Sequence, residues 1–163
     1  MTRQTFSRSV DIHAPIEAVF AWHERPDALR LLTPPGQRLI VLKPLASLHV
    51  GQRALLFALA GLIPTLWYVE HVVYDPPHEF VDRQILGPFW FWEHHHRFVA
   101  LDAQTTRLTD AIEYALPGGK LGAWLGGRLV TAQLARMFEH RHQVTRQAIE
   151  SAAGSNPEQK RID

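Results

Sequence analysis

The sequence predicts an α+β fold in which a curved antiparallel sheet of about six to seven strands wraps around one long C-terminal helix. Between residues 37 and 116, apolar segments with a two-residue period alternate with short turn motifs such as "DPPH". These connections are too short for crossover helices, so the strands should pair antiparallel. From residue 121 to about 149, apolar positions recur with the helical period instead. Only this helix is long enough to cover one face of the sheet.

Prolines indicate where the two short helices that precede the main run of strands begin and end. Alternation over residues 6–12 predicts a first strand, and Pro15 suits the first turn of a short helix that runs to about His23. Pro26 and Asp27 begin a second short helix, which must end before the two prolines of "TPPG". The later strands are expected at residues 37–42, 53–60, 65–74, 79–86, 91–101 and 105–116.

The composition is that of one globular domain. The 163 residues are 46% hydrophobic and 20% charged, enough for a single buried core. We expect one domain over residues 1–150 and a disordered tail over 151–163. Lys and Arg total 17 against 16 Asp and Glu, so no basic field favours nucleic acid. The absence of cysteine excludes disulfides and sulfur-ligated zinc, and no pattern indicates an oligomeric state.

One uncharged stretch needs to be distinguished from a membrane span. Residues 54–69, "ALLFALAGLIPTLWYV", are fewer than the roughly 20 apolar residues that a span requires, and Gly61 and Pro64 interrupt them. Two strands joined by a turn at residues 61–64 fit better. The N-terminus has no apolar run of signal-peptide length. We therefore expect a cytoplasmic protein without a membrane span.

Several segments resemble a known superfamily. "VDIHAPIEAVF" at 10–20 resembles the strand-into-helix entry of the helix-grip, START/polyketide-cyclase-like (SRPBCC) superfamily, and the similarity covers about residues 6–150. The segments at 22–35, 80–98 and 110–119 ("WHERPDALRLLTPP", "FVDRQILGPFWFWEHHHRF" and "DAIEYALPGG") resemble one bacterial subgroup, found alone or fused to an epimerase-like, NAD-dependent short-chain dehydrogenase. The resemblance implies a helix-grip fold with a deep hydrophobic ligand cavity.

Three consecutive histidines in "FWEHHHRF" are the most unusual feature. Alternate residues of a strand share a face, so His94 and His96 point the same way as Trp92 and Phe98, whereas His95 points to solvent. Two such imidazoles can bind one metal, but a third ligand is needed. Position 100, where a following carboxylate would suit, is alanine, and "LPGGK" stands where a further histidine would be required. We therefore predict no metal site and no cofactor.

The register of the last two strands decides what faces these histidines. A turn at residues 102–104 would pair Leu101 with Thr105 and set His96 opposite Asp110. A slip of one residue would set Arg97 opposite Asp110 instead, but it would break the apolar face. An unpaired carboxylate in that face costs several kcal/mol, and His96 is the nearest candidate partner.

The leading functional hypothesis is a non-catalytic cavity that binds a small hydrophobic or lipid-like molecule with one or two polar groups. The residues expected to line it are Asp82, Gln84, Trp92, His94, His96, Phe98, Asp110, Ile112, Tyr114, Leu134 and Phe138.

Two alternatives remain open. In a polyketide cyclase- or dehydratase-like lyase, His96 oriented by Asp110 would move a proton, and Tyr114 would act as the acid or as an electrophilic donor. In an accessory domain, the surface of "ALLFALAG" or "WHERP" would dock a separate NAD-dependent dehydrogenase.

Other polar and aromatic residues have simpler interpretations. Trp22 and Trp67 are expected to pack, and His23 is expected to clamp the junction between the two short helices. His140 and His142 are two positions apart on a helix and therefore diverge. The glycines after residue 117 should permit a tight entry into the long helix or close packing on the sheet.

Overall fold

The computed structural model, which describes residues 2–36, 39–60 and 63–154, has the predicted order of elements. The α+β class, the two short helices after the first strand and the long C-terminal helix are confirmed. The elements are β1 (Gln4–Ile12), α1 (Ile16–His23), α2 (Ala28–Leu31), β2 (Leu39–Lys43), β3 (Arg53–Ala60), β4 (Ile63–Asp75), β5 (Glu79–Leu86), β6 (Phe91–Asp102), β7 (Thr105–Ala115) and α3 (Gly119–Gly154).

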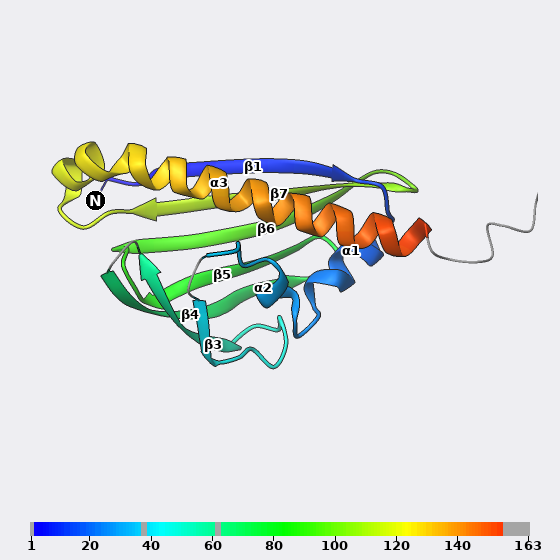
Figure 1. Ribbon diagram of the computed structural model, residues 1–163, viewed down its shortest axis with the longest axis horizontal. Coiled ribbons are helices and arrows are strands. Elements are labelled where there is room, and N and C mark those ends of the chain that lie inside the picture. The colour runs from blue at the N-terminus through cyan, green and yellow to red at the C-terminus, as the bar shows by residue number, and fades with distance from the viewer. Residues whose placement is uncertain (1, 37–38, 61–62, 155–163) are drawn as a thin grey trace, which may run out of the picture.

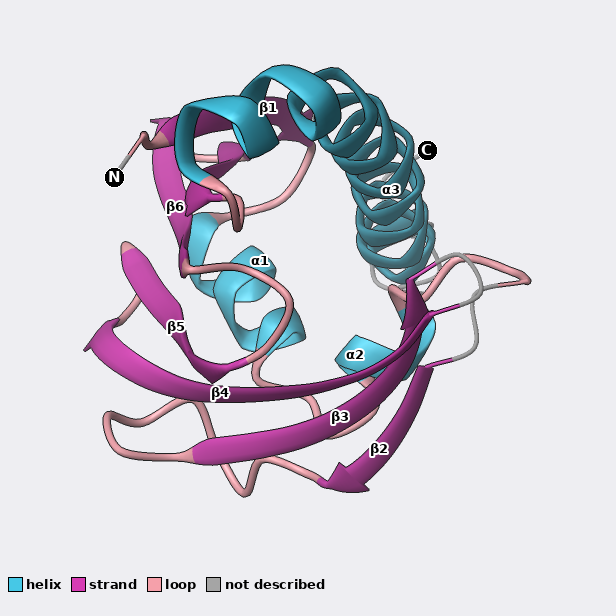
Figure 2. Ribbon diagram, turned by 90° about the vertical axis from the view of Figure 1, so that its left-hand side faces the viewer, coloured by secondary structure: helices cyan, strands magenta, loops and turns pink. Residues whose placement is uncertain are grey.

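The strands form one seven-stranded antiparallel sheet in the order β1-β7-β6-β5-β4-β3-β2. From β2 to β7 the chain meanders, and β1 pairs with β7 at the far edge. The sheet is strongly curved, and α1 and α2 lie within the curve (Figure 2). Helix α3 runs along the β1 and β7 side of the molecule (Figure 1). The helix therefore covers only one half of the concave face.

Two hydrophobic clusters fix α3 on that half. Leu134 and Phe138 pack with Trp92, Ile112 and Tyr114. Towards the C-terminal end of α3, Ile149 joins a second cluster with residues of β1, α1, β6 and β7. These apolar side chains follow the helical period, so one stripe of α3 is buried while the opposite side is exposed.

A third cluster closes the other half of the sheet without the helix. Ala54, Leu56 and Val69 of β3 and β4 are buried against Leu29 of α2 and Leu45 of the connection after β2. Because short elements rather than a rod cover this half, packing between the third cluster and α3 is incomplete. A space is left between the third cluster and α3.

The uncharged segment 54–69 contributes to two paired strands, as expected. The turn is shorter than predicted, because Ile63 and Pro64 already pair with Ala60 and Leu59, and residues 61–62 lie outside the described residues. Among the described residues, none of the helices combines the length and hydropathy needed to cross a bilayer.

The register between β6 and β7 is confirmed at the positions that matter for the site. His96 is opposite Asp110, and His94 is opposite Ile112. The prediction that Leu101 pairs with Thr105 is wrong: Asp102 pairs with Thr105, and an irregularity between Ala100 and Asp102 restores the predicted register further along. A bulge of this kind beside a turn cannot be seen in the apolar pattern.

The entry into α3 depends on glycine, as expected. Gly118 and Gly119 have φ angles of +84° and +60°, which side chains with a Cβ rarely adopt. At Gly122 an added Cβ would come within 1.8 Å of the Pro117 carbonyl oxygen. The helix extends from Gly119 to Gly154, so residues 151–154 of the expected tail are helical, and residues 155–163 lie outside the described residues.

Candidate functional site

A cavity of about 170 Å³ lies where the third cluster and α3 fail to meet. Its lining is mostly apolar and comes from α1, α2, the connections around β2, strands β3 to β6, and α3. The apolar lining residues are Ala28, Leu29, Leu32, Leu45, Leu48, Ala54, Leu56, Trp67, Val69, Phe80, Trp92 and Met137; the polar ones are His23, His71, Asp82, His94, His96 and Arg141.

The strand registers bring four polar residues together at one end of this cavity. Asp82 of β5 is directly opposite His94 of β6, and His96 of β6 is directly opposite Asp110 of β7. Alternation then directs all four side chains to the concave face. We call Asp82, His94, His96 and Asp110, together with His142 of α3, the His/Asp cluster.

Asp110 is the hub of the His/Asp cluster. Its Oδ1 accepts a hydrogen bond from His94 Nε2 at 2.8 Å and contacts His96 Nδ1 at 2.8 Å. Its Oδ2 lies 2.5 Å from His142 Nε2. Three imidazoles therefore surround one buried carboxylate, which satisfies the requirement that a buried acid be paired.

Asp82 contacts the other nitrogens of the same two strand histidines. Its Oδ1 lies 3.2 Å from His94 Nδ1 and 3.4 Å from His96 Nε2. Each of these imidazoles thus lies between two carboxylates: one ring nitrogen contacts Asp110 and the other contacts Asp82. The Asp82 side of this arrangement faces the cavity.

Paired charges override desolvation in the His/Asp cluster. Burial alone would lower the pKa of His94, but the charge of Asp82 and hydrogen bonds to both aspartates raise it to about 9. Burial alone would raise the pKa of Asp110, but the neighbouring His96, with hydrogen bonds from His142 and His94, holds it well below its usual value. Burial opposes His94 and His96 in the same way at Asp82, whose pKa is also lowered. The cluster therefore keeps two carboxylates ionised and His94 protonated at neutral pH.

Arg141 of α3 places a cation at the same cavity with no ion-pair partner in the described part of the chain. Its Nε is buried and has no hydrogen-bond partner among the described residues, and its guanidinium lies 5.3 Å from the centre of the Phe138 ring. Burial lowers the pKa of Arg141, although Asp110 and Asp82 oppose this effect. A buried Nε–H group without an acceptor is an unsatisfied donor in the cavity wall.

Trp67 supplies a second donor of this kind. Its indole ring lies edge-on to Trp92, with ring centres 5.0 Å apart, and it lines the cavity. The indole Nε1 is buried and has no partner within residues 2–36, 39–60 and 63–154. Trp67 was predicted to pack, and it does, but its polar edge is left without an acceptor from those residues.

Two further histidines in the cavity wall are structural in their bonding. His23 Nδ1 donates to the Val19 carbonyl at 2.8 Å, and His71 Nδ1 donates to the Leu48 carbonyl at 2.9 Å. Burial lowers the pKa of His23 to about 4 and also lowers the pKa of His71. Both rings are therefore neutral at physiological pH. The His23 ring also lies close to the site, with its centre 6.4 Å from the centre of the His96 ring. The predicted role at the helix junction did not include this position.

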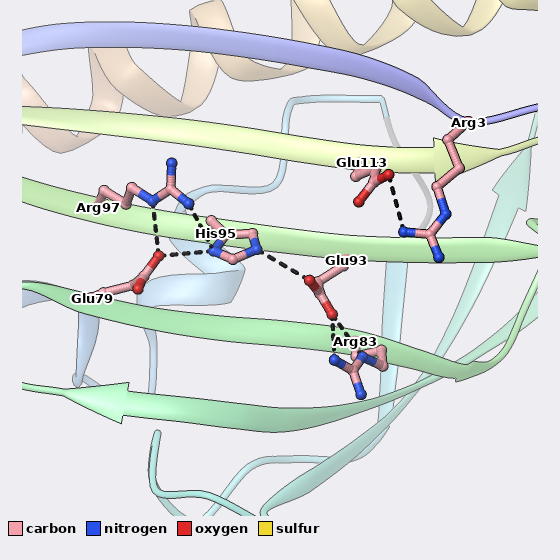
Figure 3. Close-up of polar contacts among 7 residues, drawn as sticks. All are labelled: Arg3, Glu79, Arg83, Glu93, His95, Arg97 and Glu113. Atoms are coloured by element: carbon pink, nitrogen blue, oxygen red, sulfur yellow. Dashed lines mark hydrogen bonds and ion pairs between the residues drawn. The ribbon is translucent and has the colours of Figure 1, made fainter.

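The outer face of the sheet carries a separate set of ion pairs. His95 lies between Glu79 and Glu93, with nitrogen–oxygen distances of 2.8 Å and 3.2 Å (Figure 3). Arg97 and Arg83 extend this arrangement along the surface. The predicted division of the histidine triplet between two faces is thus observed: His95 lies on the outer face, and His94 and His96 lie on the concave face.

The structure divides the predicted site residues into two groups. Asp82, Trp92, His94 and His96 line the main cavity, whereas Asp110 and Phe138 line a smaller adjoining space of about 10 Å³. The others do not line either space, and three of them have specific roles elsewhere. The Gln84 amide donates to the Phe89 carbonyl at 2.7 Å, the Tyr114 hydroxyl contacts Thr131 Oγ1 at 3.1 Å, and Phe98 packs 5.2 Å from Phe20.

Sequence reasoning missed His142 and Arg141. His142 follows Leu134 and Phe138 at intervals of four residues, so it continues the same buried stripe. The observation that His140 and His142 diverge is correct, but it left open which of them faces the sheet. The unused signal was this continuation of the stripe by a polar residue.

Solved structures share this fold across nearly the whole chain. A Thermus thermophilus protein is 18% identical with a TM-score of 0.70, and the match covers 91% of this chain and 99% of that one. The Zhui aromatase/cyclase from a Streptomyces species is 16% identical with a TM-score of 0.70, covering 91% and 94%. The Thalictrum flavum norcoclaurine synthase, in complex with dopamine and hydroxybenzaldehyde, is 13% identical with a TM-score of 0.68, covering 91% and 88%.

These likenesses show the fold of the protein. The curved sheet, the long C-terminal helix and the neighbours together confirm the predicted helix-grip fold, which is the fold of polyketide-cyclase-like proteins. No protein-family model matches the chain, and no curated protein matches it. The resemblance to one bacterial subgroup, and a separate dehydrogenase partner, stay predictions.

Proposed function

We propose that this protein binds a compact small molecule, about the size of one substituted aromatic ring, that carries a carboxylate or a similar acceptor group. The observation that carries this proposal is a pair of buried donors, Arg141 Nε and Trp67 Nε1, that have no partner among the described residues and belong to the wall of one largely apolar cavity. Apolar walls bind the ring, and the donors select the polar end.

The size of the cavity supports a compact ligand. An engineered cavity of about 150 Å³ is known to bind benzene, whereas pockets for drug-sized ligands occupy roughly 300–1,000 Å³. The volume of about 170 Å³ is close to the first value. It favours a single ring over the long acyl chain of a lipid. The norcoclaurine synthase complex with dopamine and hydroxybenzaldehyde supports the idea that this fold accommodates single-ring molecules.

The charges support an acidic ligand. Asp82 and Asp110 are engaged by histidines, whereas Arg141 forms no ion pair among the described residues. Burying the Arg141 Nε–H group without an acceptor costs stability. A bound carboxylate would recover that cost through a charge-assisted hydrogen bond. Trp67 can donate to a second acceptor on the same molecule.

Titration calorimetry with benzoate and 4-hydroxybenzoate as probes, and neutral benzamide for comparison, tests the proposal. We expect both acids to bind more tightly than benzamide. Arg141→Met should weaken benzoate binding at least tenfold, and Trp67→Phe should weaken it less. Arg146→Met, which removes an exposed cation from the same helix, should leave the affinity unchanged. Equal affinities of wild type and Arg141→Met would contradict the acidic-ligand proposal.

A second candidate function is proton transfer. His96 lines the cavity and contacts Asp110 at 2.8 Å on its far side, which is the arrangement of an imidazole oriented by a carboxylate. Tyr114 does not line the cavity, which gives no support to its predicted role as an acid. If the protein is a cyclase or dehydratase, His96→Gln should abolish turnover of an aromatic β-keto substrate while benzoate still binds. Unchanged turnover in that variant would exclude the role of His96.

A further inference from the structure

We infer that Asp82, His94 and His96 form a binding site for one divalent first-row transition metal ion, open on its fourth side to the cavity. The three side chains come from the adjacent strands β5 and β6, and their ligand atoms lie within 4.8 Å of one another. Two imidazoles and one carboxylate are a common ligand set for such ions when a position is left for water or substrate. This inference does not depend on the proposed ligand.

The spacing of the ligand atoms is the first argument. Donor atoms about 2.0–2.1 Å from a tetrahedral ion are separated from each other by roughly 3.3 Å. Asp82 Oδ1 lies 3.2 Å from His94 Nδ1 and 3.4 Å from His96 Nε2. Both separations exceed the roughly 2.7–2.9 Å of a strong charge-assisted hydrogen bond. They are closer to the length of two edges of such a tetrahedron.

The orientation of the two rings is the second argument. His94 points Nε2 at Asp110 and His96 points Nδ1 at the same oxygen, each at 2.8 Å. A carboxylate behind each imidazole holds a proton on the nitrogen that faces it, so the opposite nitrogen becomes the ligand atom once the metal ion displaces any proton it carries. In both rings that opposite nitrogen is the one beside Asp82. His142 contacts the other carboxylate oxygen of Asp110 and so helps to fix the orientation of the Asp110 side chain.

The three proposed ligand residues are accessible from the cavity. Asp82, His94 and His96 all line the main cavity, so a small ligand can reach the open side of the site. Asp110 and His142 do not line the main cavity and act as positioning residues. Spacing along the chain after the H-x-H pair indicated no third ligand. The structure supplies it from the preceding strand.

Cobalt titration of tag-free protein, pretreated with a chelator, tests the inference. We expect one equivalent of Co²⁺ to bind with visible d–d absorption, and Zn²⁺ to displace it. Asp82→Asn and His96→Gln should each lower the Zn²⁺ affinity at least tenfold in competition with a fluorescent chelator. His95→Gln, the neighbour on the outer face, should bind as wild type does. Asp110→Asn should lose about 10- to 100-fold through the loss of ring orientation.

Two results would overturn the inference. One is the absence of one-equivalent Co²⁺ or Zn²⁺ binding to the wild-type protein. The other is equal affinity of wild type and both ligand variants, with circular dichroism showing that the variants are folded, since surface histidines would then account for the binding. The benzoate titration is read out separately on metal-free protein, so failure of one proposal leaves the other standing.

Discussion

In the proposed function, Arg141 would bind the ligand at the expense of stability. Its Nε is desolvated and unpaired among the described residues, which destabilises the ligand-free fold. We predict that Arg141→Met raises the free energy of unfolding by about 1 kcal/mol, because an unsatisfied donor is removed and the methionine fills the same apolar space. Urea denaturation of ligand-free protein measures this. A loss of stability of similar size would instead assign Arg141 a structural role.

His23 makes a prediction about acid stability. Its pKa is about 4 in the folded protein against about 6.5 in the unfolded chain, so the unfolded state binds more protons between those values. Stability contributed by the neutral ring is present above pH 6.5 and is lost as the pH falls towards 4, by about 3 kcal/mol at most.

The test is denaturation of metal-free protein across about pH 4 to 7, the range that spans both pKa values. His23→Gln should flatten the pH dependence of the unfolding free energy, and His13→Gln on the surface should not. Some slope will remain, because burial also lowers the pKa of His71. If the slope of His23→Gln matched that of wild type, His23 would not be the buried neutral ring described here.

At the level of single residues, the sequence predicted the strand side of the site but not the helix side. Alternation and register follow from local pattern, so His94, His96 and Asp110 could be placed on one face. The rotation of α3 about its axis is set by tertiary packing, and His142 and Arg141 depend on it. Whether a buried polar side chain is left unpaired also cannot be read from the chain.

Among the elements, the start of α3 leaves little space for a side chain at Gly122. Gly122 lies against the backbone of Pro117, whereas an added Cβ at Gly126 would meet only a Leu116 methyl group, at 3.2 Å. We predict that Gly122→Ala destabilises the protein by about 1–3 kcal/mol, because backbone must move. Gly126→Ala should be nearly neutral, since better helix propensity offsets a small side-chain adjustment.

Thermal unfolding of both variants measures the difference. Equal midpoints would show that the helix entry can relax, and that the close contact at residue 122 does not constrain it. The apolar period predicted that a helix occurs here, but the start of the helix is fixed by this backbone contact.

At the scale of the whole molecule, the cavity arises from the mismatch between a curved sheet and a straight helix. Helix α3 covers β1, β7 and β6, and small apolar residues such as Ala54 and Ala28 line the space on the other side. The sequence predicted this arrangement because the order of elements allows only one cover for the sheet. It did not predict that α2 and the connections around β2 close the second half, since their residues show no periodic pattern.

Filling the space should separate binding from folding. Ala54 is buried and lines the cavity, so Ala54→Leu adds volume where there is room for it. We predict that benzoate binding is lost while the unfolding temperature changes by only a few degrees. Ala111→Leu on the outer face is the matched control and should bind benzoate normally. Retained binding in Ala54→Leu would place the ligand elsewhere.

A crystal structure of the protein grown with benzoate would show whether the cavity is the binding site. We expect one ring in the cavity beside Trp67, with its carboxylate within hydrogen-bond distance of the Arg141 guanidinium. Benzoate bound only at the surface, with the Arg141 and Trp67 donors paired to protein atoms inside a closed core, would contradict it.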